Sequence, residues 1–402
     1  MGVDWGSETH VVCVLDRDRR RLAECSYPHS GAGLTALADD LIALAPTEPG
    51  RIGVALEIPR GAIVDTLLER GLHVFSLNPK KLDRFRDRHT VAGAKDDRRD
   101  AFVLADSLRT DRPVFRRVQA DHPRVIELRE LARVDDDLGQ DLRRLSNRLR
   151  AQLHRFFPQA LTLCPAADDP WFWALLERVP TPVHAQRLSA KTVAAVLKVY
   201  RLRRLTVETI REALQSPPVH VAPGTVEAAS AHIALLLPRL RLLHDQRLKI
   251  ARQIETLLEE LGQEDVPGEH RDVTILRSLP GVGRVVAATV LVEAARPLAE
   301  RDYQTLRAQG GIAPVTRQSG KKISVSMRYG CNSRLRNAFY HWARTSVQSD
   351  PHCRAHYDRL RHHGHGHARA LRGVADRSLA VLVAMLRTRT LYDADRRRGR
   401  AA

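Results

Sequence analysis

The stretch MGVDWGSETHVVCVLD, residues 1–16, opens a regular alternation of strand-like and helix-like segments. Its second part, VVCVLD, is apolar and β-branched, which is typical of a buried strand. Two more runs of this kind follow, RIGVALEI at 51–58 and HVFSLNP at 73–79. Segments with helical spacing lie between and after them, at 33–45, 61–71 and 100–109. This alternation predicts an α/β layer with a partly parallel sheet over residues 1–120.

The region 121–265 carries no strand signal, and its leucines recur at spacings near three, four and seven. This pattern predicts two long helices with coiled-coil-like seams. The seams either face another protomer, which would make 121–265 a dimerisation region, or pack together within one domain. Prolines between positions 170 and 223 predict short helices and loops in the part between the seams.

The region 266–402 is mixed but mostly helical in its pattern. ILRSLPGVGRVVAATVLVEA at 275–294 predicts a helix, a tight glycine turn and a second helix. The segment 310–330 predicts a loop and a short strand, and 333–348 and 377–392 predict helices. HHGHGH at 362–367 has no cysteine or acid at zinc-ligand spacing, so we expect a partly cationic loop there.

The chain is strongly basic, with 65 Lys and Arg against 47 Asp and Glu over 402 residues, a net charge of +18. A surplus of this size indicates a polyanionic partner, usually nucleic acid. No apolar run of about 18 residues is present, so we expect no membrane span. The five cysteines are scattered without a CxxC pair, which favours reduced thiols and a cytoplasmic protein.

Four acidic residues stand at positions where carboxylates have chemical meaning. Asp4 lies in a strand-like segment and Glu57 ends another, and a buried carboxylate costs several kcal/mol unless it is paired or bound to a metal. Asp97 and Asp100 are three residues apart at a helix start, so both face one side of that helix. Asp96 cannot share that side and is expected to be the helix N-cap.

Two strand-borne acids and a helix-borne pair are suited to a site with two Mg²⁺ ions for phosphoryl transfer. The alternative is that each acid is structural or solvated and that the charges form a self-neutralising surface patch. In the first interpretation, the cations beside the helix start would face a nucleic-acid backbone: Lys95, Arg98 and Arg99.

Two loops of the C-terminal region carry further candidates. LPGVG at 279–283 resembles the turn of a helix-hairpin-helix, whose glycines, Gly281 and Gly283, would present N–H groups to a phosphate beside Arg284. TRQSGKKISVSMRYG at 316–330 places a serine in a basic loop, and a metal or cation would have to activate it as a nucleophile. Three serines compete for this role, Ser319, Ser324 and Ser326, among the cations Lys321, Lys322 and Arg328.

Seven motifs together resemble the transposases of the insertion sequence 110 family. The first four are similar to the RuvC-like half of those proteins: VDWGS (3–7), LEIPRG (56–61), NPKKLDRFR (78–86) and AKDDRRDAFVLA (94–105). The other three resemble the second half: LRSLPGVG (276–283), GGIAPVTRQSGKK (310–322) and RYGCNSRLRNAFYHWAR (328–344). The two sets occur in the family's order, and the region between them matches only as a helical spacer.

The resemblance implies an RNase H-like, RuvC-like domain at 1–120, a helical coiled-coil spacer at 121–265 and a transposase domain at 266–402. It implies an acidic quartet that binds Mg²⁺, which falls on Asp4, Glu57, Asp97 and Asp100. It also implies a serine nucleophile, which falls on Ser319 and would form a covalent phosphoserine link to DNA. In this family the active site is shared between protomers of a homodimer or homotetramer, and a bridge RNA guides the choice of DNA.

Three other functions compete with a transposase. A RuvC-like nuclease would hydrolyse DNA with water and would need no serine. A non-catalytic nucleic-acid-binding protein would use the helix-hairpin-helix alone. VDWGS also resembles the phosphate loop of actin-like sugar kinases, but the sequence has neither their second Asp-x-Gly loop nor their Gly-rich adenosine site.

Overall fold

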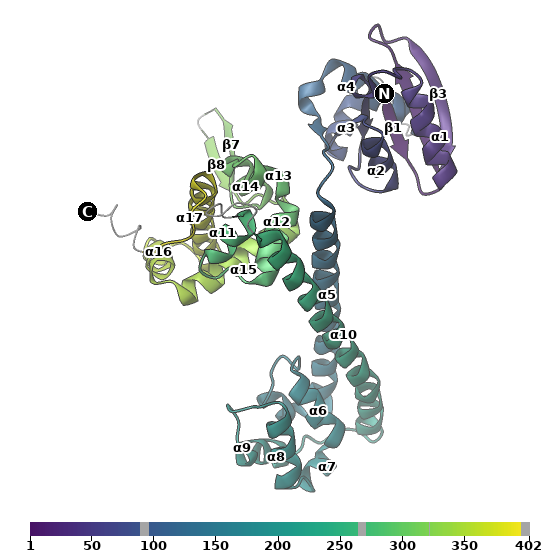
Figure 1. Ribbon diagram of the computed structural model, residues 1–402. Coiled ribbons are helices and arrows are strands. Elements are labelled where there is room, and N and C mark those ends of the chain that lie inside the picture. The colour runs from purple at the N-terminus through teal and green to yellow at the C-terminus, as the bar shows by residue number, and fades with distance from the viewer. Residues whose placement is uncertain (89–95, 264–270, 321, 395–402) are drawn as a thin grey trace, which may run out of the picture. The chain divides into compact units, whose positions relative to one another are not determined.

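The computed structural model describes residues 1–88, 96–263, 271–320 and 322–394 (Figure 1). The candidate cations Lys95 and Lys321 lie outside the described residues. The chain forms two compact units, Met1–His122 and Pro123–Ala402. Each unit is built around its own secondary structure and is described separately below.

The first unit contains a six-stranded sheet in the order β3-β2-β1-β4-β5-β6. The pairs β1–β4 and β4–β5 are parallel, and the other three pairs are antiparallel. The prediction of an α/β layer with a partly parallel sheet is therefore confirmed. The strands are β1 (Gly2–Trp5), β2 (Thr9–Leu15), β3 (Arg21–Pro28), β4 (Gly53–Leu56), β5 (His73–Ser76) and β6 (Arg116–Arg117).

Helices cover both faces of this sheet (Figure 1). Val3, Val54 and Leu56 pack into one core with α1 (Gly31–Ile42) and α2 (Ala62–Glu69). Ala55 and Phe75 face the other way and pack with α3 (Pro79–Arg86) and α4 (Asp97–Thr110). The alternation of side chains along a strand explains why neighbouring residues of β4 belong to different cores.

Two long helices organise the second unit. α5 (Pro123–Phe156) and α10 (Thr225–Gly262) pack along each other (Figure 1), and Arg247 Nε donates to Asp135 Oδ1 at 3.0 Å between them. Leu145, Leu149 and Leu240 are buried in their shared core. The predicted leucine seams thus contact each other within one chain.

Short helices fill the segment between α5 and α10, as the prolines predict. They are α6 (Pro170–Arg178), α7 (Pro182–Gln186), α8 (Ala190–Val199) and α9 (Val207–Gln215). Trp171, Phe172 and Trp173 of α6 are buried in a core with the C-terminal end of α5 and the N-terminal end of α10. A separate core at the opposite ends of α5 and α10 holds the C-terminal helices.

The C-terminal part consists of helices and one β-hairpin. The elements are α11 (Asp272–Ser278), α12 (Arg284–Glu293), α13 (Ala295–Ala299), α14 (Tyr303–Gln309), β7 (Val315–Ser319), β8 (Lys322–Ser326), α15 (Ser333–Ser349), α16 (Pro351–His362) and α17 (His367–Thr388). The expected single strand in 310–330 is two paired strands. The last helix begins at His367, ten residues before the predicted start, and ends where Arg389 takes a left-handed conformation with φ 52°. The expected loop is present at 363–366, between His362, the last residue of α16, and His367, the first residue of α17.

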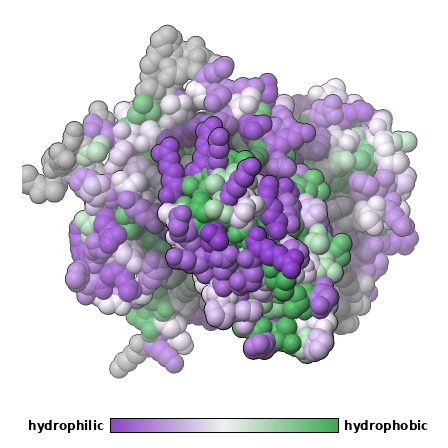
Figure 2. Space-filling model, turned by 90° about the horizontal axis from the view of Figure 1, so that it is seen from below, coloured by the Kyte–Doolittle hydropathy of each residue, from purple (hydrophilic) through white to green (hydrophobic). Residues whose placement is uncertain are grey.

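Polar and charged side chains dominate the face of the molecule that is drawn in Figure 2. Figure 2 shows one face, on which hydrophilic residues surround smaller apolar areas. Within the part of the chain that the structure describes, no helix combines the length and apolarity that crossing a bilayer requires.

Candidate active site

The parallel pairing of β1 with β4 brings two predicted acids to one place. Gly2 pairs with Ala55, and Asp4 and Glu57 each stand two residues further along. Because side chains alternate along a strand, Asp4 shares the face of Gly2, and Glu57 continues the face of Ala55. Both carboxylates therefore belong to the carboxyl ends of neighbouring strands, on the face that α3 and α4 cover.

A glycine allows α4 to lie directly on β1. A Cβ atom added to Gly2 would stand 2.0 Å from the backbone oxygen of Ala101 and 2.5 Å from the backbone nitrogen of Ala105. Any side chain at this position would push the helix away from the sheet. The close approach fixes the height of α4 above the strand that carries Asp4.

The direction of α4 determines where its two acids lie. Leu108, near the helix end, reaches Gly53 at the start of β4, 3.2 Å from a Cβ added there. The helix therefore runs antiparallel to the strands, and its first turn lies at their carboxyl ends. Gly2 lies beside Ala101 and Ala105, and Asp4 lies two strand residues, or ~6.6 Å, further along β1. At ~1.5 Å per helical residue, this distance corresponds to about four residues back along α4, which is the first turn with Asp97 and Asp100. The strand register and the direction of α4 therefore place the four predicted acids, which all belong to the described residues, toward the same edge of the sheet, where their ligand atoms form no group of three within 4.8 Å.

Asp100 is buried, with 1% of its surface exposed, and it is paired with Arg86 of α3. Arg86 Nε donates to Asp100 Oδ1 at 2.5 Å, and Arg86 Nη2 donates to Oδ2 at 2.6 Å. The hydrogen bonds to Asp100 raise the pKa of Arg86 against the lowering effect of burial, and the charges of Asp83 and Glu57 contribute. A cation thus stands among the acids at this edge.

The remaining charged residues of the α4 start are exposed. Asp96 is the N-cap, as predicted, and its side chain accepts from the backbone N–H of Arg98 at 3.4 Å. Asp97 and Arg99 are exposed in the first turn, and Arg98 Nε lies 3.5 Å from Glu24 Oε1. Two predicted nucleic-acid contacts, Arg98 and Arg99, are therefore accessible on the same turn as the paired acids.

The candidate serines lie on the β7–β8 hairpin of the second unit. Ser319 pairs with Lys322, and Ser324 pairs with Arg317. Ser326 occupies the same side two residues beyond Ser324, so the three serines share one exposed face with two cations. Ser319 is the last residue of β7, directly before the turn residue Gly320, whose φ is +55°.

Arg328, predicted to contact nucleic acid, is engaged at the base of this hairpin. Its Nε donates to the carbonyl of Ala313 at 3.2 Å, and its Nη2 donates to the carbonyl of Pro314 at 3.5 Å. These bonds tie the end of β8 to the residues before β7. The side chain is half-buried and supports the hairpin that carries the serines.

The LPGVG turn joins α11 to α12 and is held against α15. The carbonyl of Pro280 accepts from Trp342 Nε1 at 3.0 Å and from Ser346 Oγ at 2.7 Å. Gly281 has φ +80°, and an added Cβ would stand 2.6 Å from Ser346 N. Only glycine fits both this conformation and this contact.

The start of α12 has the features of a phosphate-binding helix end. Gly283 is its exposed N-cap without a side-chain hydrogen bond, and the first turn contains no acid. Arg284 places a cation at this end, where the helix dipole disfavours positive charge unless an anion is near.

Comparison with known proteins supplies the family. Residues 1–158 match a family model for the DEDD transposases of the IS110 type, and residues 273–358 match the model described as "Transposase IS116/IS110/IS902 family". The "Mini-circle putative transposase for IS117" of Streptomyces coelicolor is 32% identical over 98% of this chain and 95% of its own length. The chain belongs to the IS110 family of transposases.

Two other relatives are consistent with this family. The "Insertion element IS110 uncharacterized 43.6 kDa protein" of Streptomyces coelicolor is 30% identical over 98% of this chain and 95% of its own length. The "Putative transposase y4uE" of Sinorhizobium fredii is 48% identical over 204 residues, which cover 50% of this chain and 57% of y4uE. This chain thus spans just over half the length of y4uE and nearly all of the other two.

One group of possible metal ligands in this IS110-family chain lies away from the sheet. Among the described residues, the group of three whose ligand atoms lie within 4.8 Å of one another is Cys164, Asp168 and Asp169, and the four predicted acids form no such group. Asp169 already accepts from Trp171 Nε1 at 3.1 Å and from Arg204 Nη2 at 3.2 Å. Burial raises the pKa of Cys164, which disfavours the thiolate a metal requires. The group is best explained as structural.

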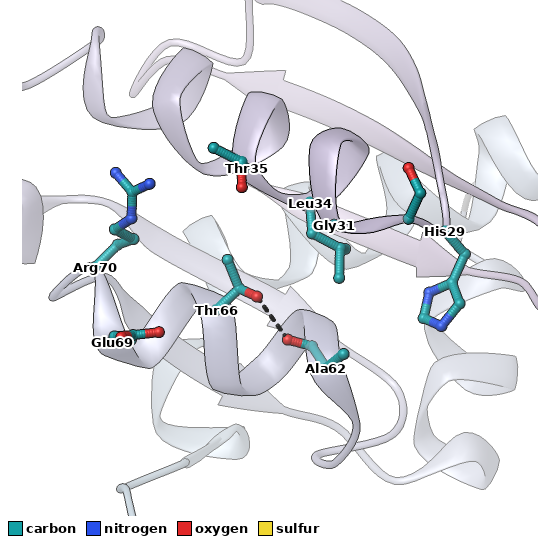
Figure 3. A pocket seen from close by; sticks show the side chains of 9 residues that line it. His29, Gly31, Leu34, Thr35, Ala62, Thr66, Glu69 and Arg70 are labelled. Atoms are coloured by element: carbon teal, nitrogen blue, oxygen red, sulfur yellow. Dashed lines mark hydrogen bonds between the residues drawn. The ribbon is translucent and has the colours of Figure 1, made fainter.

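An open cavity of about 810 Å³ lies between α1 and α2 of this chain (Figure 3). Its lining includes His29, Thr35, Glu69 and Arg70, and Thr66 Oγ1 is bonded to the carbonyl of Ala62. None of the predicted acids lines it, because α1 and α2 cover the opposite face of the sheet.

Proposed function

We propose that this transposase cuts and rejoins DNA with the acidic quartet Asp4, Glu57, Asp97 and Asp100 and the nucleophile Ser319. The observation that carries the proposal is the placement of α4 on β1. It brings acids from three separate segments of the chain to one edge of the sheet. Membership in a transposase family supplies DNA as the substrate.

The sheet order supports an RNase H-like, RuvC-like fold for the first unit. Three consecutive antiparallel strands are followed by two parallel strands that extend the sheet from β1. In this proposal the acids at the carboxyl ends of the central strands form the catalytic edge.

The donor set fits Mg²⁺, because carboxylate oxygens are the hard ligands that this ion prefers. The edge already accommodates positive charge, since Asp100 is paired with Arg86. Asp4, Glu57, Asp97 and Asp100 would hold the ions, which would supply charge stabilisation for phosphoryl transfer. The exposed Arg98 and Arg99 would orient the DNA backbone beside them.

Ser319 would act as the nucleophile on a DNA phosphodiester. Its Oγ–phosphorus bond would form as the bond to the 3′-oxygen breaks, with the serine proton lost and the leaving oxygen taking up a proton. Arg317 and Lys322 share the face of Ser319 and would hold the phosphate. As the resemblance to this family implies, we infer an active site shared between protomers of a homodimer or homotetramer.

A covalent adduct assay tests the serine. Purified protein, Mg²⁺ and labelled junction DNA are incubated, denatured and separated on a gel, where a phosphoserine link shifts the label to the protein. We expect Ser319→Ala and Asp97→Asn to abolish the adduct. Ser324→Ala and Ser326→Ala are matched controls on the same face and should retain it. Loss of the adduct in Ser324→Ala alone would move the nucleophile to that position.

A RuvC-like nuclease is the second candidate function, because the four acids lie within one compact unit that does not include Ser319. Such an enzyme would activate water and release cut DNA without a covalent intermediate. The same assay separates the two, since Ser319→Ala would keep cutting DNA at the wild-type rate in a hydrolase.

The turn LPGVG and a bridge RNA complete the proposal. The N–H groups at the start of α12, with Arg284, would bind one phosphate of the nucleic acid as a helix-hairpin-helix does.

We infer that a non-coding bridge RNA guides DNA choice, since the net charge of +18 is sufficient for two nucleic-acid partners. Sequencing of RNA that copurifies with the protein tests this, and only random cellular RNA would contradict it.

A further inference from the structure

Arg86 occupies a position among the proposed metal ligands that the sequence motif did not explain. It is the last residue of α3, and its guanidinium forms two parallel hydrogen bonds with both oxygens of Asp100, at 2.5 and 2.6 Å. Arg86 Nη1 also donates to Asp83 Oδ1 at 2.5 Å, and the charge of Glu57 acts on Arg86. One of the four proposed ligands, Asp100, is therefore bonded directly to this cation.

Arg86 compensates the charge of the Asp100 carboxylate, which is almost completely buried. The side chain of Asp100 is 2% exposed and that of Arg86 is 22% exposed. An unpaired charge at such a position would cost several kcal/mol, and the planar fork of arginine matches a carboxylate well. The guanidinium of Arg86 thus provides a hydrogen-bond donor to each carboxylate oxygen of Asp100.

The same two oxygens are those that Asp100 would offer to a divalent cation. A guanidinium within hydrogen-bond distance and a divalent ion on the same carboxylate would repel each other strongly in a buried site. Arg86 has another partner to move to, since Asp83 lies three residues before it on α3 and its side chain is 66% exposed. Arg86 Nη1 already donates to Asp83, so the guanidinium would keep an acidic partner if it left Asp100.

We propose that Arg86 is a positioning residue that neutralises Asp100 in the resting protein and releases it when a divalent cation binds. This inference rests on the proposed function, because it takes Asp100 as a metal ligand. It adds that metal affinity is set by competition with a cation of the chain. A fixed Arg86 that only orients Asp100 would have the opposite effect on affinity.

Mn²⁺ binding to the full chain without DNA tests the competition, measured by the electron paramagnetic resonance signal of free Mn²⁺. We expect Arg86→Met to bind Mn²⁺ about tenfold more tightly than the wild type, because the competing charge is gone. Arg84→Met removes an exposed cation from the same helix and should change the affinity by less than about twofold. Weaker or unchanged binding in Arg86→Met would overturn the inference.

Two further variants separate the possible failures. Arg86→Lys keeps the charge but loses the two-pronged geometry, and it should bind Mn²⁺ a few-fold more tightly even if Arg86→Met does not fold. Wild-type affinity in a folded Arg86→Lys would count against the inference. Asp100→Asn must weaken Mn²⁺ binding at least tenfold. If it binds as the wild type does, the proposed metal site is wrong, whatever the Arg86 variants show.

Thermal unfolding provides a second readout. Without metal, Arg86→Met should unfold at a lower temperature than the wild type, because Asp100 is left buried and unpaired. Saturating Mn²⁺ should then raise its unfolding temperature by more than it raises that of the wild type. Equal increases in the two proteins would contradict the release of Asp100 on metal binding.

Discussion

At the scale of single residues, the site depends on positions with no chemical function of their own. Because Gly2 has no Cβ atom, the backbone of α4 can approach β1 closely. Asp96 ends the chain segment before α4 and caps the helix, which fixes the turn that contains Asp97 and Asp100. The candidate acids are thus positioned by a glycine and a helix cap.

The substitution Gly2→Ala tests this dependence. The added Cβ would collide with the backbone at Ala101, so we expect a loss of roughly 1–3 kcal/mol in the free energy of unfolding. Mn²⁺ affinity should fall as well, because α4 must move. The measurements are urea denaturation and metal titration. Gly31→Ala is the control, because an added Cβ there has no atom within 4 Å, and its free energy of unfolding should equal that of the wild type. Equal losses of stability in Gly2→Ala and Gly31→Ala would contradict the role of Gly2.

At the scale of elements, helices far apart in sequence are joined through a few buried polar groups. Glu293 at the end of α12 accepts from Arg133 Nε of α5 at 3.0 Å and from Asn332 Nδ2, the N-cap of α15, at 2.7 Å. Burial would raise the pKa of Glu293, but these two hydrogen bonds hold it below its ordinary value. One carboxylate therefore ties α5, α12 and α15 together at the C-terminal end of α12.

Glu293→Gln should destabilise the protein by about 1–3 kcal/mol at pH 7, since the amide keeps the shape but loses the charge. A lowered pKa in the folded state means that Glu293 contributes stability above the unfolded pKa of about 4.3. This contribution is lost as the pH falls through the lowered value. Urea denaturation at several pH values should therefore show the two proteins converging in acid.

Glu300→Gln provides the matched control for this prediction. Glu300 is bonded to Arg296 on the surface, with about half of its side chain exposed, so its loss should cost less than about 1 kcal/mol. The difference in free energy of unfolding between Glu293→Gln and the wild type should shrink from pH 7 to pH 3. A constant difference over this range would show that the charge of Glu293 does not cause the loss of stability.

At the scale of the whole molecule, the chain combines an α/β unit that holds the four candidate acids with a helical unit that holds a basic hairpin. The first unit has 19 basic and 19 acidic residues, so the net charge of +18 belongs to the second unit, which has 46 basic and 28 acidic residues. Binding to DNA should accordingly depend on contacts to many phosphates and only weakly on any single one.

Salt dependence measures this property. A protein with roughly 6–10 phosphate contacts loses ~10³–10⁵ in affinity between 50 and 200 mM salt. We expect a loss of this size for wild type in fluorescence anisotropy with junction DNA. Arg99→Gln should weaken binding uniformly and lower the slope of log K against log salt by about one. Affinity that does not change with salt would contradict backbone-dominated binding.

The elements themselves were largely predictable. The runs 51–58 and 73–79 are strands because their apolar, β-branched residues suit a sheet covered on both faces. The turn at Gly281 was predictable because few other residues take its conformation. The end of α17 and the first strand of the hairpin were not, since the exposed polar residues Arg317, Gln318 and Ser319 of β7 show no alternation of polar and apolar side chains.

The sequence by itself determined the family, the alternation of strands and helices, the capping of α4 by Asp96 and the surplus of positive charge. These follow from local rules of backbone conformation, side-chain spacing and composition, and from motifs kept in order. Only the tertiary structure decided that α4 crosses β1 at Gly2 and that Arg86 holds Asp100. The physical reason is that both depend on atoms from distant segments meeting at hydrogen-bond and van der Waals distances, which no local pattern encodes.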